Sequence, residues 1–494
     1  MKTIIILFLV LAISILTLRS QEQQFLWAQS YEVSNCNEVA AIATDTSENI
    51  ILAGVHEGGV FVPYRGNIYI LKTDPEGNTL WTANILGDLI MGDLIAVNEE
   101  IILVGQATGA LEYNDIQYGS LQYYLFAFKF DSNGNVMWFF EDESKLGTYA
   151  NLSVGEDNTF LLHARTQSNL GDWIMIMNMD GTIENSRLLS PSHTLIRDAA
   201  YYNGNVYLNG QLSGLSGVTI DTLYIPQSPL ESTAFVLALD ENLTGAWLSI
   251  DTTLNNGAGR IAADFKGVFA YQETMSPPFN IVQNLKKFNF NGELIKETEI
   301  PTYAPTANIL PEIALTNDRI ALFNKNSFST NNYIVLIYDK ELELLQEKVI
   351  TGPSDPYSNQ ITSGNQNFYI SHVHSGTLNL NDEISLAYIG SGLHPYIAKI
   401  GETTTTKLDQ NNIASNGLSI YPNPARDKIL ISYDHSTAIP VKIEIFNLSG
   451  RSVLKISLFK IDEALDIRKL DAGIYVLKST LSDGNEVQQK LIIR

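Results

Sequence analysis

The amino-acid sequence predicts an all-β protein, a seven-bladed β-propeller followed by a small C-terminal Ig-like β-sandwich. Three observations lead to this prediction. A strand–turn–strand pattern recurs seven times between residues 41 and 370, with its turns about 53 residues apart. A second such pattern, whose turn begins with Asp or Asn, follows most copies of the first. The last 77 residues then carry five alternating apolar and polar segments of strand length.

The first pattern pairs two short apolar runs, such as residues 41–43 with 50–54 and residues 94–97 with 101–105. Runs of this length, rich in Ile, Val, Leu and Ala and separated by polar residues, predict a tight hairpin. The turns of the seven copies are centred near Asn49, Glu99, Asp157, Gly204, Lys266, Asp318 and Gln366.

The second pattern is clearest at residues 68–81 and 125–138. In both copies a strand of seven residues ends in Asp74 or Asp131, a glycine follows three residues later, and a tryptophan follows four residues after that. Asp bonds its own backbone and Gly permits positive φ, so each copy predicts a second hairpin. Two hairpins make a four-stranded sheet per repeat. Sheets that repeat every 40 to 60 residues are typical of a propeller, where the radial arrangement protects their edges.

The ends of the repeat array predict how it is completed. Residues 395–401 form the last strand of the second kind, and no tryptophan-bearing strand follows them. Residues 25–29, which include Trp27, supply such a strand at the other end. This favours a closed seven-bladed ring over an open β-solenoid. Four longer middle segments predict extra hairpins or surface loops, where binding usually resides: residues 55–67, 106–122, 211–232 and 375–394.

The N-terminus predicts export. Lys2 precedes an apolar run over residues 4–18, and Leu18-Arg19-Ser20 stand before a candidate cleavage point at Gln21, as in a secretory signal peptide of residues 1–20. The run is about 15 residues long, whereas a helix needs roughly 20 apolar residues to span a bilayer. This length favours the cleaved signal peptide over the alternative, an uncleaved membrane anchor. No later run approaches that length, and we expect no transmembrane segment in the mature chain. Cys36 is the single cysteine, which excludes an intramolecular disulfide.

Charge limits the possible partners. The chain has 54 acidic and 31 basic side chains, a formal net charge of −23. Residues 21–414 hold 45 acidic and 18 basic side chains, whereas residues 415–494 hold nine and eleven, so the acidity belongs to the repeats. Such a surface repels phosphate backbones and anionic membranes, and we expect no nucleic-acid partner.

After a propeller at residues 21–402, residues 403–417 are polar and without period, which predicts a linker, and residues 418–494 predict the sandwich. Four ordered blocks in this last segment, at residues 421–425, 443–450, 470–478 and 490–494, resemble the type A C-terminal sorting domain of the type IX (Por) secretion system. The resemblance assigns the sorting motif to Tyr421, Pro422, Asn423, Pro424, Gly473, Tyr475, Lys478 and Lys490. We expect Tyr475 in the core and Gly473 in a turn.

The resemblance implies Sec export, transfer across an outer membrane by the type IX secretion machinery, and removal of the sorting domain on release or on surface attachment. The repeats also resemble the propeller-type passenger repeats that often precede such tails, most clearly over residues 210–247. Those passengers share no common activity, so this resemblance implies a fold and a location at the surface or outside the cell, but no reaction.

Motifs for chemistry are sparse. His372 and His374 lie two apart on a predicted strand, so they share one face and could hold a metal with His394; a packed pair is the favoured interpretation. The turn at residues 131–135 carries calcium-like oxygens but lacks a closing Glu. Asp74 and Asp131 resemble the Asp-boxes of sialidase-like propellers, yet the spacing favours a structural turn. We therefore predict no metal, no cofactor and no catalytic residue.

Two functional hypotheses remain. The favoured one is a non-catalytic surface or extracellular module that binds a protein or glycan ligand through loops on one face. The alternative is a secreted hydrolase acting on polysaccharide or glycoconjugate, for which carboxylates such as those at residues 141–143 would have to face one another across a cleft. A structural surface-coat role is a third possibility.

Overall fold

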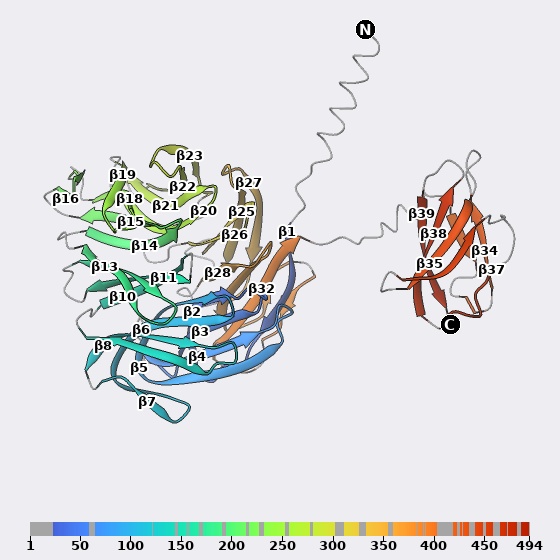
Figure 1. Cartoon of the computed structure of the whole chain (residues 1–494), viewed down its shortest axis with the longest axis horizontal. Coiled ribbons are helices and arrows are strands. Elements are labelled where there is room, and N and C mark those ends of the chain that lie inside the picture. Colours follow the sequence, from blue (N-terminus) through green and yellow to red (C-terminus); the bar gives the residue numbers. More distant parts are fainter. Residues whose placement is uncertain are drawn as a thin grey trace, which may run out of the picture. The chain divides into compact units, whose positions relative to one another are not determined.

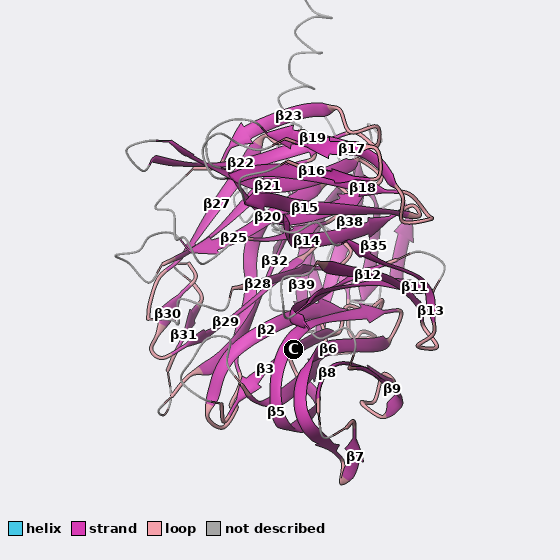
Figure 2. Cartoon of the chain, turned by 90° about the vertical axis from the view of Figure 1, so that its left-hand side faces the viewer, coloured by secondary structure: helices cyan, strands magenta, loops and turns pink. Residues whose placement is uncertain are grey.

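The computed structural model describes residues 23–58, 65–120, 122–143, 147–155, 158–166, 171–189, 194–213, 217–226, 232–251, 256–276, 280–301, 311–325, 332–353, 359–381, 383–388, 390, 392–402, 418–421, 425–426, 428–433, 440–447, 451–457, 465–471, 473–481 and 486–493. All regular structure in these residues is β-strand, as Figure 2 shows. The chain divides into two compact units, Met1–Thr403 and Thr404–Arg494. The predicted signal peptide and linker lie outside the described residues.

The larger unit begins with an eight-stranded sheet in which one long strand is shared (Figure 1). Through Thr79 to Leu89, β5 pairs with β4, and through Leu86 to Val97 it pairs with β6, so two four-stranded groups have β5 in common. The strands are β2 (Cys36–Thr44), β3 (Ile50–His56), β4 (Gly66–Thr73), β5 (Thr79–Val97), β6 (Glu100–Tyr113), β7 (Ile116–Tyr118), β8 (Tyr123–Phe130) and β9 (Val136–Asp142).

Four antiparallel sheets of four strands follow in the unit. Three are built from consecutive or nearly consecutive strands: β10 (Gly147–Val154), β11 (Thr159–Thr166), β12 (Asp172–Asn178) and β13 (Ile183–Leu189); β14 (Thr194–Tyr202), β15 (Asn205–Ser213), β18 (Ser232–Leu239) and β19 (Gly245–Asp251); β20 (Asn256–Asp264), β21 (Gly267–Ser276), β22 (Asn280–Phe288) and β23 (Leu294–Glu299). The fourth comprises β24 (Glu312–Leu315), β25 (Arg319–Lys325), β26 (Tyr333–Asp339) and β27 (Leu344–Ile350). Each of the first six repeats of the sequence thus becomes two linked hairpins, as predicted.

The last sheet of the unit holds both ends of the repeat array. Its order is β28 (Gln360–Ser363), β29 (Phe368–His374), β32 (His394–Glu402) and β1 (Gln23–Ser30). The pairing of β1 with β32 confirms that the N-terminal strand completes this sheet. Two of the longer middle segments form the separate hairpins β16 (Val218–Ile220) with β17 (Leu223–Ile225) and β30 (Leu378–Asn379) with β31 (Ser385–Leu386), and a third contributes β7.

Neighbouring sheets meet in a regular order, which gives the unit a propeller-like arrangement. The first strands contact one another in the sequence β2, β5, β10, β14, β20, β24, β28 and again β2. Buried side chains fill the space between neighbouring sheets. One such cluster joins Tyr369, Val373 and Ile397 of the last sheet to Ile42 and Leu52 of the first. Because sheets bury their apolar faces against each other in this way, the core is divided among the interfaces.

Tryptophan side chains link the outer strand of one four-stranded group to the next group at four places. Each indole Nε1–H donates to a carbonyl in the Asp or Asn turn of the following repeat: Trp27 to Pro75 (3.2 Å), Trp81 to Ser132 (3.0 Å), Trp138 to Met179 (3.0 Å) and Trp247 to Phe290 (2.9 Å). The glycine of that turn lies against the indole ring with positive φ, and a Cβ there would meet the ring at 3.4 Å for Gly134 and 2.6 Å for Gly292. The Trp27 contact joins the last sheet to the first.

The smaller unit contains two antiparallel sheets. One comprises β33 (Leu418–Tyr421), β34 (Lys428–Tyr433) and β37 (Leu465–Asp466), and the other comprises β36 (Ser452–Ser457), β35 (Pro440–Asn447), β38 (Gly473–Leu481) and β39 (Glu486–Ile493). Buried residues from both, including Ile429, Ile443, Leu477 and Leu491, form one apolar core. The five predicted strand segments are therefore confirmed, and β33 and β37 are two additional short strands.

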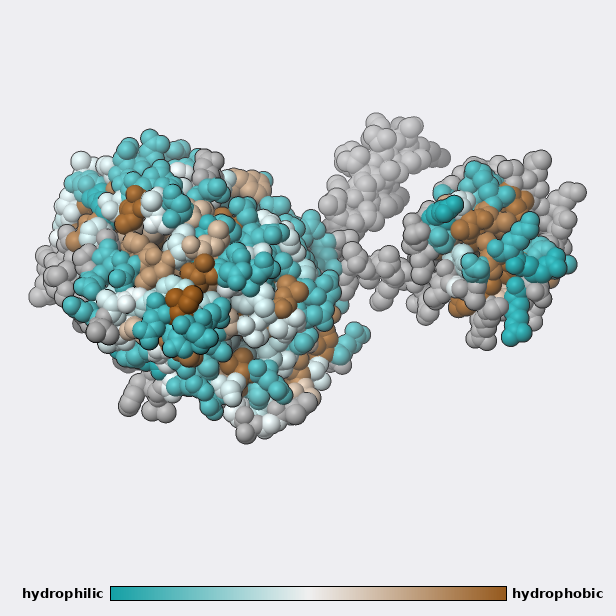
Figure 3. Space-filling view, turned by 60° about the horizontal axis from the view of Figure 1, so that its bottom comes forward, coloured by the Kyte–Doolittle hydropathy of each residue, from teal (hydrophilic) through white to brown (hydrophobic). Residues whose placement is uncertain are grey.

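The surface of the larger unit is mostly hydrophilic in the view of Figure 3, with apolar side chains in small separate patches. Large exposed apolar residues occur on outer strands, such as Leu80 of β5, Met137 of β9 and Leu344 of β27. Scattered single residues of this kind are normal for a soluble surface. Within the described part of the chain, no helix long and apolar enough to cross a bilayer is found.

Candidate functional site

The first strand of each repeat in the larger unit lines one cavity of about 400 Å³. Lining residues come from β2, β5, β10, β14, β20, β24 and β28. Most are small or aliphatic, for example Ala199, Ala262 and Ala314, which leaves room at the centre. The volume lies within the range of small-molecule binding pockets.

Polar side chains occur at one recurring position of these strands. In each first strand, this position stands immediately before an apolar residue that pairs with the second strand. The residues found there are Asp93, Asn151, Asp198, Arg260, Glu312 and Gln360, with Ala40 in β2. The ladder register shifts at this level in β2, β5, β14 and β20. A bulge changes the direction of a side chain, and all seven residues line the cavity.

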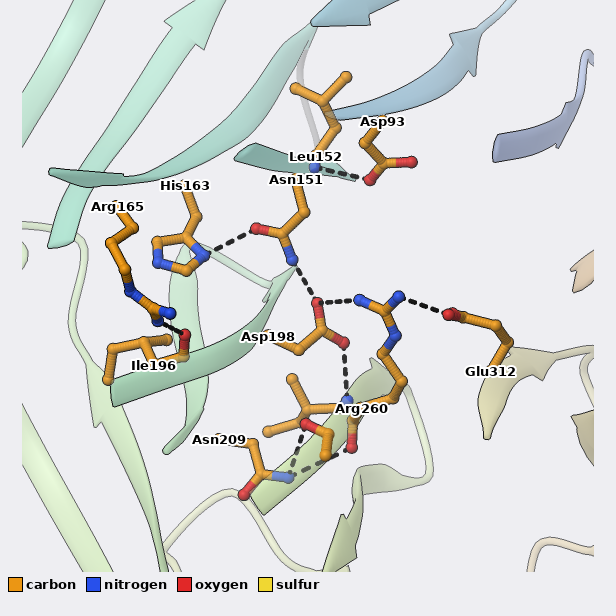
Figure 4. A network of polar contacts seen from close by, with 12 residues as sticks. Asp93, Asn151, Leu152, His163, Arg165, Ile196, Asp198, Asn209, Arg260 and Glu312 are labelled. Carbon is orange, nitrogen blue, oxygen red and sulfur yellow. Dashed lines mark hydrogen bonds and ion pairs between the residues drawn. The ribbon is translucent and has the colours of Figure 1, made fainter. Parts of the chain in front are cut away.

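Arg260 lies between two carboxylates (Figure 4). Its guanidinium forms an ion pair with Glu312 and lies 3.8 Å from Asp198. Asp198 also accepts a hydrogen bond from the backbone N–H of Ile261 at 2.9 Å and another from the Asn151 amide. Burial raises the pKa of both carboxyl groups, and the positive charge of Arg260 offsets part of that effect.

The polar network continues away from the cavity into the sheet of β10 to β13. Asn151 Oδ1 contacts His163 Nδ1 at 2.7 Å, and His163 Nε2 contacts Asp172 at 2.9 Å. His163 and Asp172 are fully buried. The Asn151 amide oxygen contacts His163 and its amide nitrogen donates to Asp198. The buried histidine therefore holds the side chains of Asn151 and Asp198 in place at the cavity wall.

Asp93 lies apart from this network, as Figure 4 shows. Its carboxylate accepts hydrogen bonds from the backbone N–H groups of Leu94 (2.7 Å) and Leu152 (2.8 Å). The group is surrounded by protein on most sides but opens on the cavity. Burial raises the pKa of Asp93 to about 7, although the two amides and Arg260 act in the opposite direction.

His372 and His374, for which a packed pair was the favoured interpretation, are packed side chains. His372 is fully buried, its Nδ1 lies 2.6 Å from the Val373 carbonyl, and its ring contacts Tyr333. His374 Nε2 lies 2.8 Å from the Ser30 hydroxyl, and its Nδ1 lies 2.7 Å from the carbonyl of Gly376. The His374 and His394 ring centroids are 6.2 Å apart. No group of three metal-ligating side chains is found in the described residues.

The aspartates of the turns at residues 74–78 and 131–135 stabilise the turn backbone by hydrogen bonding. Asp131 accepts hydrogen bonds from the backbone N–H groups of Asn133 and Asn135 and from the Asn135 side chain, and Asp74 bonds its own turn in the same way. This agrees with the structural interpretation of both turns. The acidic residues 141–143 lie at the end of the outer strand β9 and do not line the cavity.

The sorting-motif residues are placed in part. Tyr475 is buried in β38 and its hydroxyl donates to the Asp471 carbonyl at 2.8 Å. Gly473 opens β38 and pairs with Ile493, so its expected place in a turn is wrong. Lys478 and Lys490 lie on β38 and β39, and Tyr421 ends β33. Pro422, Asn423 and Pro424 fall outside the described residues.

Sequence reasoning missed the cavity residues Asp93, Asn151, Asp198, Arg260 and Glu312. The signal that could have found them is a polar residue at the same position of most repeats when the repeats are aligned with one another. Each of these residues stands one or two positions before the apolar run of the first strand in its copy. A polar residue at the same point of most repeats, where apolar strands begin, indicates side chains that meet at the centre.

Comparison with known proteins identifies the smaller unit. Residues 419–494 match the family described as the secretion system C-terminal sorting domain. The chain therefore carries a type IX sorting domain. This domain marks the protein for type IX secretion to the cell surface or the extracellular space, and it implies the type IX machinery as a partner.

Two curated proteins are similar over short stretches. They are ulvan lyase NLR42 of Nonlabens ulvanivorans, with 37% identity over 93 residues, and beta-agarase D of Zobellia galactanivorans, with 33% identity over 101 residues. Each match covers 19% of this chain, and 17% and 20% of the respective relative. The chain thus spans about a fifth of the length of these relatives.

Solved structures with some likeness to this chain include BBS1N in complex with ARL6DN, with a TM-score of 0.42 and 12% identity, covering 77% of this chain and 98% of that one. Another is the quinohemoprotein alcohol dehydrogenase from Comamonas testosteroni, with a TM-score of 0.37 and 9% identity, covering 76% of each chain.

Proposed function

We propose that the larger unit is a closed seven-bladed β-propeller over residues 21–402, preceded by a signal peptide at residues 1–20. The cyclic contacts of the first strands support closure, as does the sheet that holds both β1 and β32. We also propose a linker at residues 403–417 and an Ig-like sandwich for the sorting domain at residues 418–494. Two sheets around one apolar core support the latter.

We further propose that this exported ring is a non-catalytic binding module that takes a hydroxylated glycan group into the cavity. The observation that supports recognition is the engagement of Asp198 and Glu312 with Arg260. Hydrolysis of a glycosidic bond needs two carboxyl groups free to act on either side of that bond. Carboxylates and amides held in fixed positions are instead suited to accept and donate hydrogen bonds to sugar hydroxyls.

The alternative is a secreted hydrolase, and Asp93 is the observation in its favour. A carboxyl group whose pKa is raised to about 7 by burial is suited to act as a general acid near neutral pH. The names of the lyase and agarase relatives concern polysaccharides, but their matched stretches cover about a fifth of this chain and of each relative, so they carry no reaction over to it.

A glycan array and a polysaccharide substrate panel with the purified chain test the proposal. We expect saturable binding without turnover. Ala40→Tyr, which fills the cavity from the recurring position of β2, should abolish binding, whereas Ala246→Tyr on the exposed face of β19 should leave it unchanged. Turnover that is lost in Asp93→Asn would overturn the binding proposal in favour of the hydrolase. Binding that survives Ala40→Tyr would place the ligand elsewhere.

A further inference from the structure

The charges that line the cavity do not balance. Asp93, Asp198 and Glu312 contribute three carboxylates, and Arg260 contributes one cation, which pairs with Asp198 and Glu312. Among the described residues, Asp93 forms no ion pair; its two recorded partners are the backbone N–H groups of Leu94 and Leu152. One acid at the cavity wall therefore lacks a cationic partner within the described part of the chain.

The geometry leaves part of this carboxylate available to a ligand. A carboxylate offers about four lone-pair sites, and the two backbone amides use one site on each oxygen. The carboxyl group also lines the cavity. An unpaired carboxylate in partly desolvated surroundings is costly, and a cation placed beside it removes much of that cost.

We propose that the cavity takes a ligand that carries a protonated primary amine, and that Asp93 is the counter-ion of this amine. This inference rests on the proposed binding function and specifies its ligand as an amine-bearing sugar. A primary ammonium has three donors, one or two of which can engage Asp93 while sugar hydroxyls contact the remaining polar wall.

An ammonium suits this wall better than a divalent metal. Calcium takes six to eight oxygen ligands, and it needs several carboxylates that are not engaged elsewhere. Here Asp198 and Glu312 are bonded to Arg260, and the guanidinium would repel a doubly charged ion. An ammonium needs only the single carboxylate that remains.

The site should depend on pH. The charged groups that face Asp93 across the cavity are Arg260 on β20, Asp198 on β14 and Glu312 on β24, while His163 lies behind Asn151. Burial raises the pKa of Asp93 to about 7. Below that pH the carboxyl group is neutral and loses its attraction for an ammonium, so binding of an amine that stays protonated throughout should weaken as the pH falls from 7.5 to 6.

Titration calorimetry with matched sugars tests the inference. Glucosamine, galactosamine and mannosamine are each compared with the N-acetyl form, which lacks the positive charge. For the sugar that fits, we expect the amine to bind at least about tenfold more tightly at pH 7.5, in line with a charge-assisted bond. Asp93→Asn should reduce this preference to about twofold or less. Asp88→Asn, an exposed substitution on the same strand, should preserve it.

Each other result has a distinct meaning. Equal binding of the amine and N-acetyl forms would overturn the amine inference and leave glycan binding standing. Saturable heat from calcium chloride alone that Asp93→Asn removes would replace the ammonium with a metal ion and also overturn it. If neither sugar form binds and the glycan array is empty, the proposed binding function fails, and the inference fails with it.

Discussion

Arg260 is the side chain on which the two paired carboxylates of the cavity depend. Replacing it with Met leaves Asp198 and Glu312 buried without a cation. We expect Arg260→Met to lower the free energy of unfolding by about 2 to 4 kcal/mol near pH 7.5, because unpaired buried charge is strongly destabilising. Urea denaturation provides the measurement. Arg187→Met, which breaks a more exposed pair with Asp221, is the control and should cost about 1 kcal/mol or less.

Asp93 gives a stability effect with a defined direction in pH. Its pKa in the folded protein, about 7, is above the ordinary value of 3.8, so its stabilising contribution is complete at acid pH and is lost as the pH rises through 7. Asp93→Asn does not titrate. Relative to wild type, the variant should therefore gain about 2 kcal/mol between pH 5 and pH 8. A constant difference between the two proteins across this range would contradict the raised pKa.

Among individual residues, those with partners nearby in the chain could be predicted from the sequence. The turn functions of Asp74 and Asp131 follow from local spacing, because their partners lie within four residues. The cavity residues could not be found in this way. Asp198 and Glu312 are 114 positions apart in the chain, and only the arrangement of the sheets brings both to Arg260.

At the scale of elements, the contact between an indole and the following turn is the recurring link. Gly134 and Gly292 have nearly equal φ angles of +83° and +84°, so alanine is equally strained in the backbone at both. The space differs, since a Cβ would lie 3.4 Å from Trp81 but 2.6 Å from Trp247. We expect Gly134→Ala to cost about 1 to 2 kcal/mol and Gly292→Ala at least about 1 kcal/mol more. Thermal unfolding of both variants tests this, and equal losses would contradict it.

The elements themselves were largely predictable. The seven hairpins of the first pattern and the placement of β1 beside β32 follow from apolar runs, turn residues and the count of tryptophan-bearing strands. The sequence does not indicate that β5 runs without interruption from one group of four strands into the next, because residues 86–93 carry no continuous strand pattern. The short β37 was missed because two residues are too few to show a period.

For the whole molecule, the stability of the larger unit depends on β1, the strand that completes its last sheet. Deleting residues 23–30 would expose the edge of β32, remove buried Phe25 and break the Trp27 link to the first sheet. We expect a loss of several kcal/mol and a tendency to aggregate through the open edge. Trp27→Phe, which keeps the strand but loses the donor, should be much milder. Size-exclusion chromatography and melting curves would separate the two variants; similar behaviour would contradict a completing function for β1.

The sorting domain predicts a location that can be tested in cells. Deleting residues 418–494 should leave the protein in the periplasm, because the type IX machinery would have no domain to recognise. Val453→Ser, on an exposed position of β36, should preserve export. Cell fractionation with a tag in the larger unit measures the outcome. Unchanged surface display of the truncated protein would contradict the assignment.

The pairing of β1 with β32 also sets an order of events during synthesis. Residues 23–30 are made long before residues 396–402, so the first strand must wait for its partner while the intervening repeats are produced. Pairing across so many residues is slow, because the entropy of closing the chain opposes it until the neighbouring sheets have formed. A chain that stops early keeps β1 unpaired and open to proteases. Such a fragment also ends before residues 419–494, so it lacks both the completed last sheet and the sorting domain.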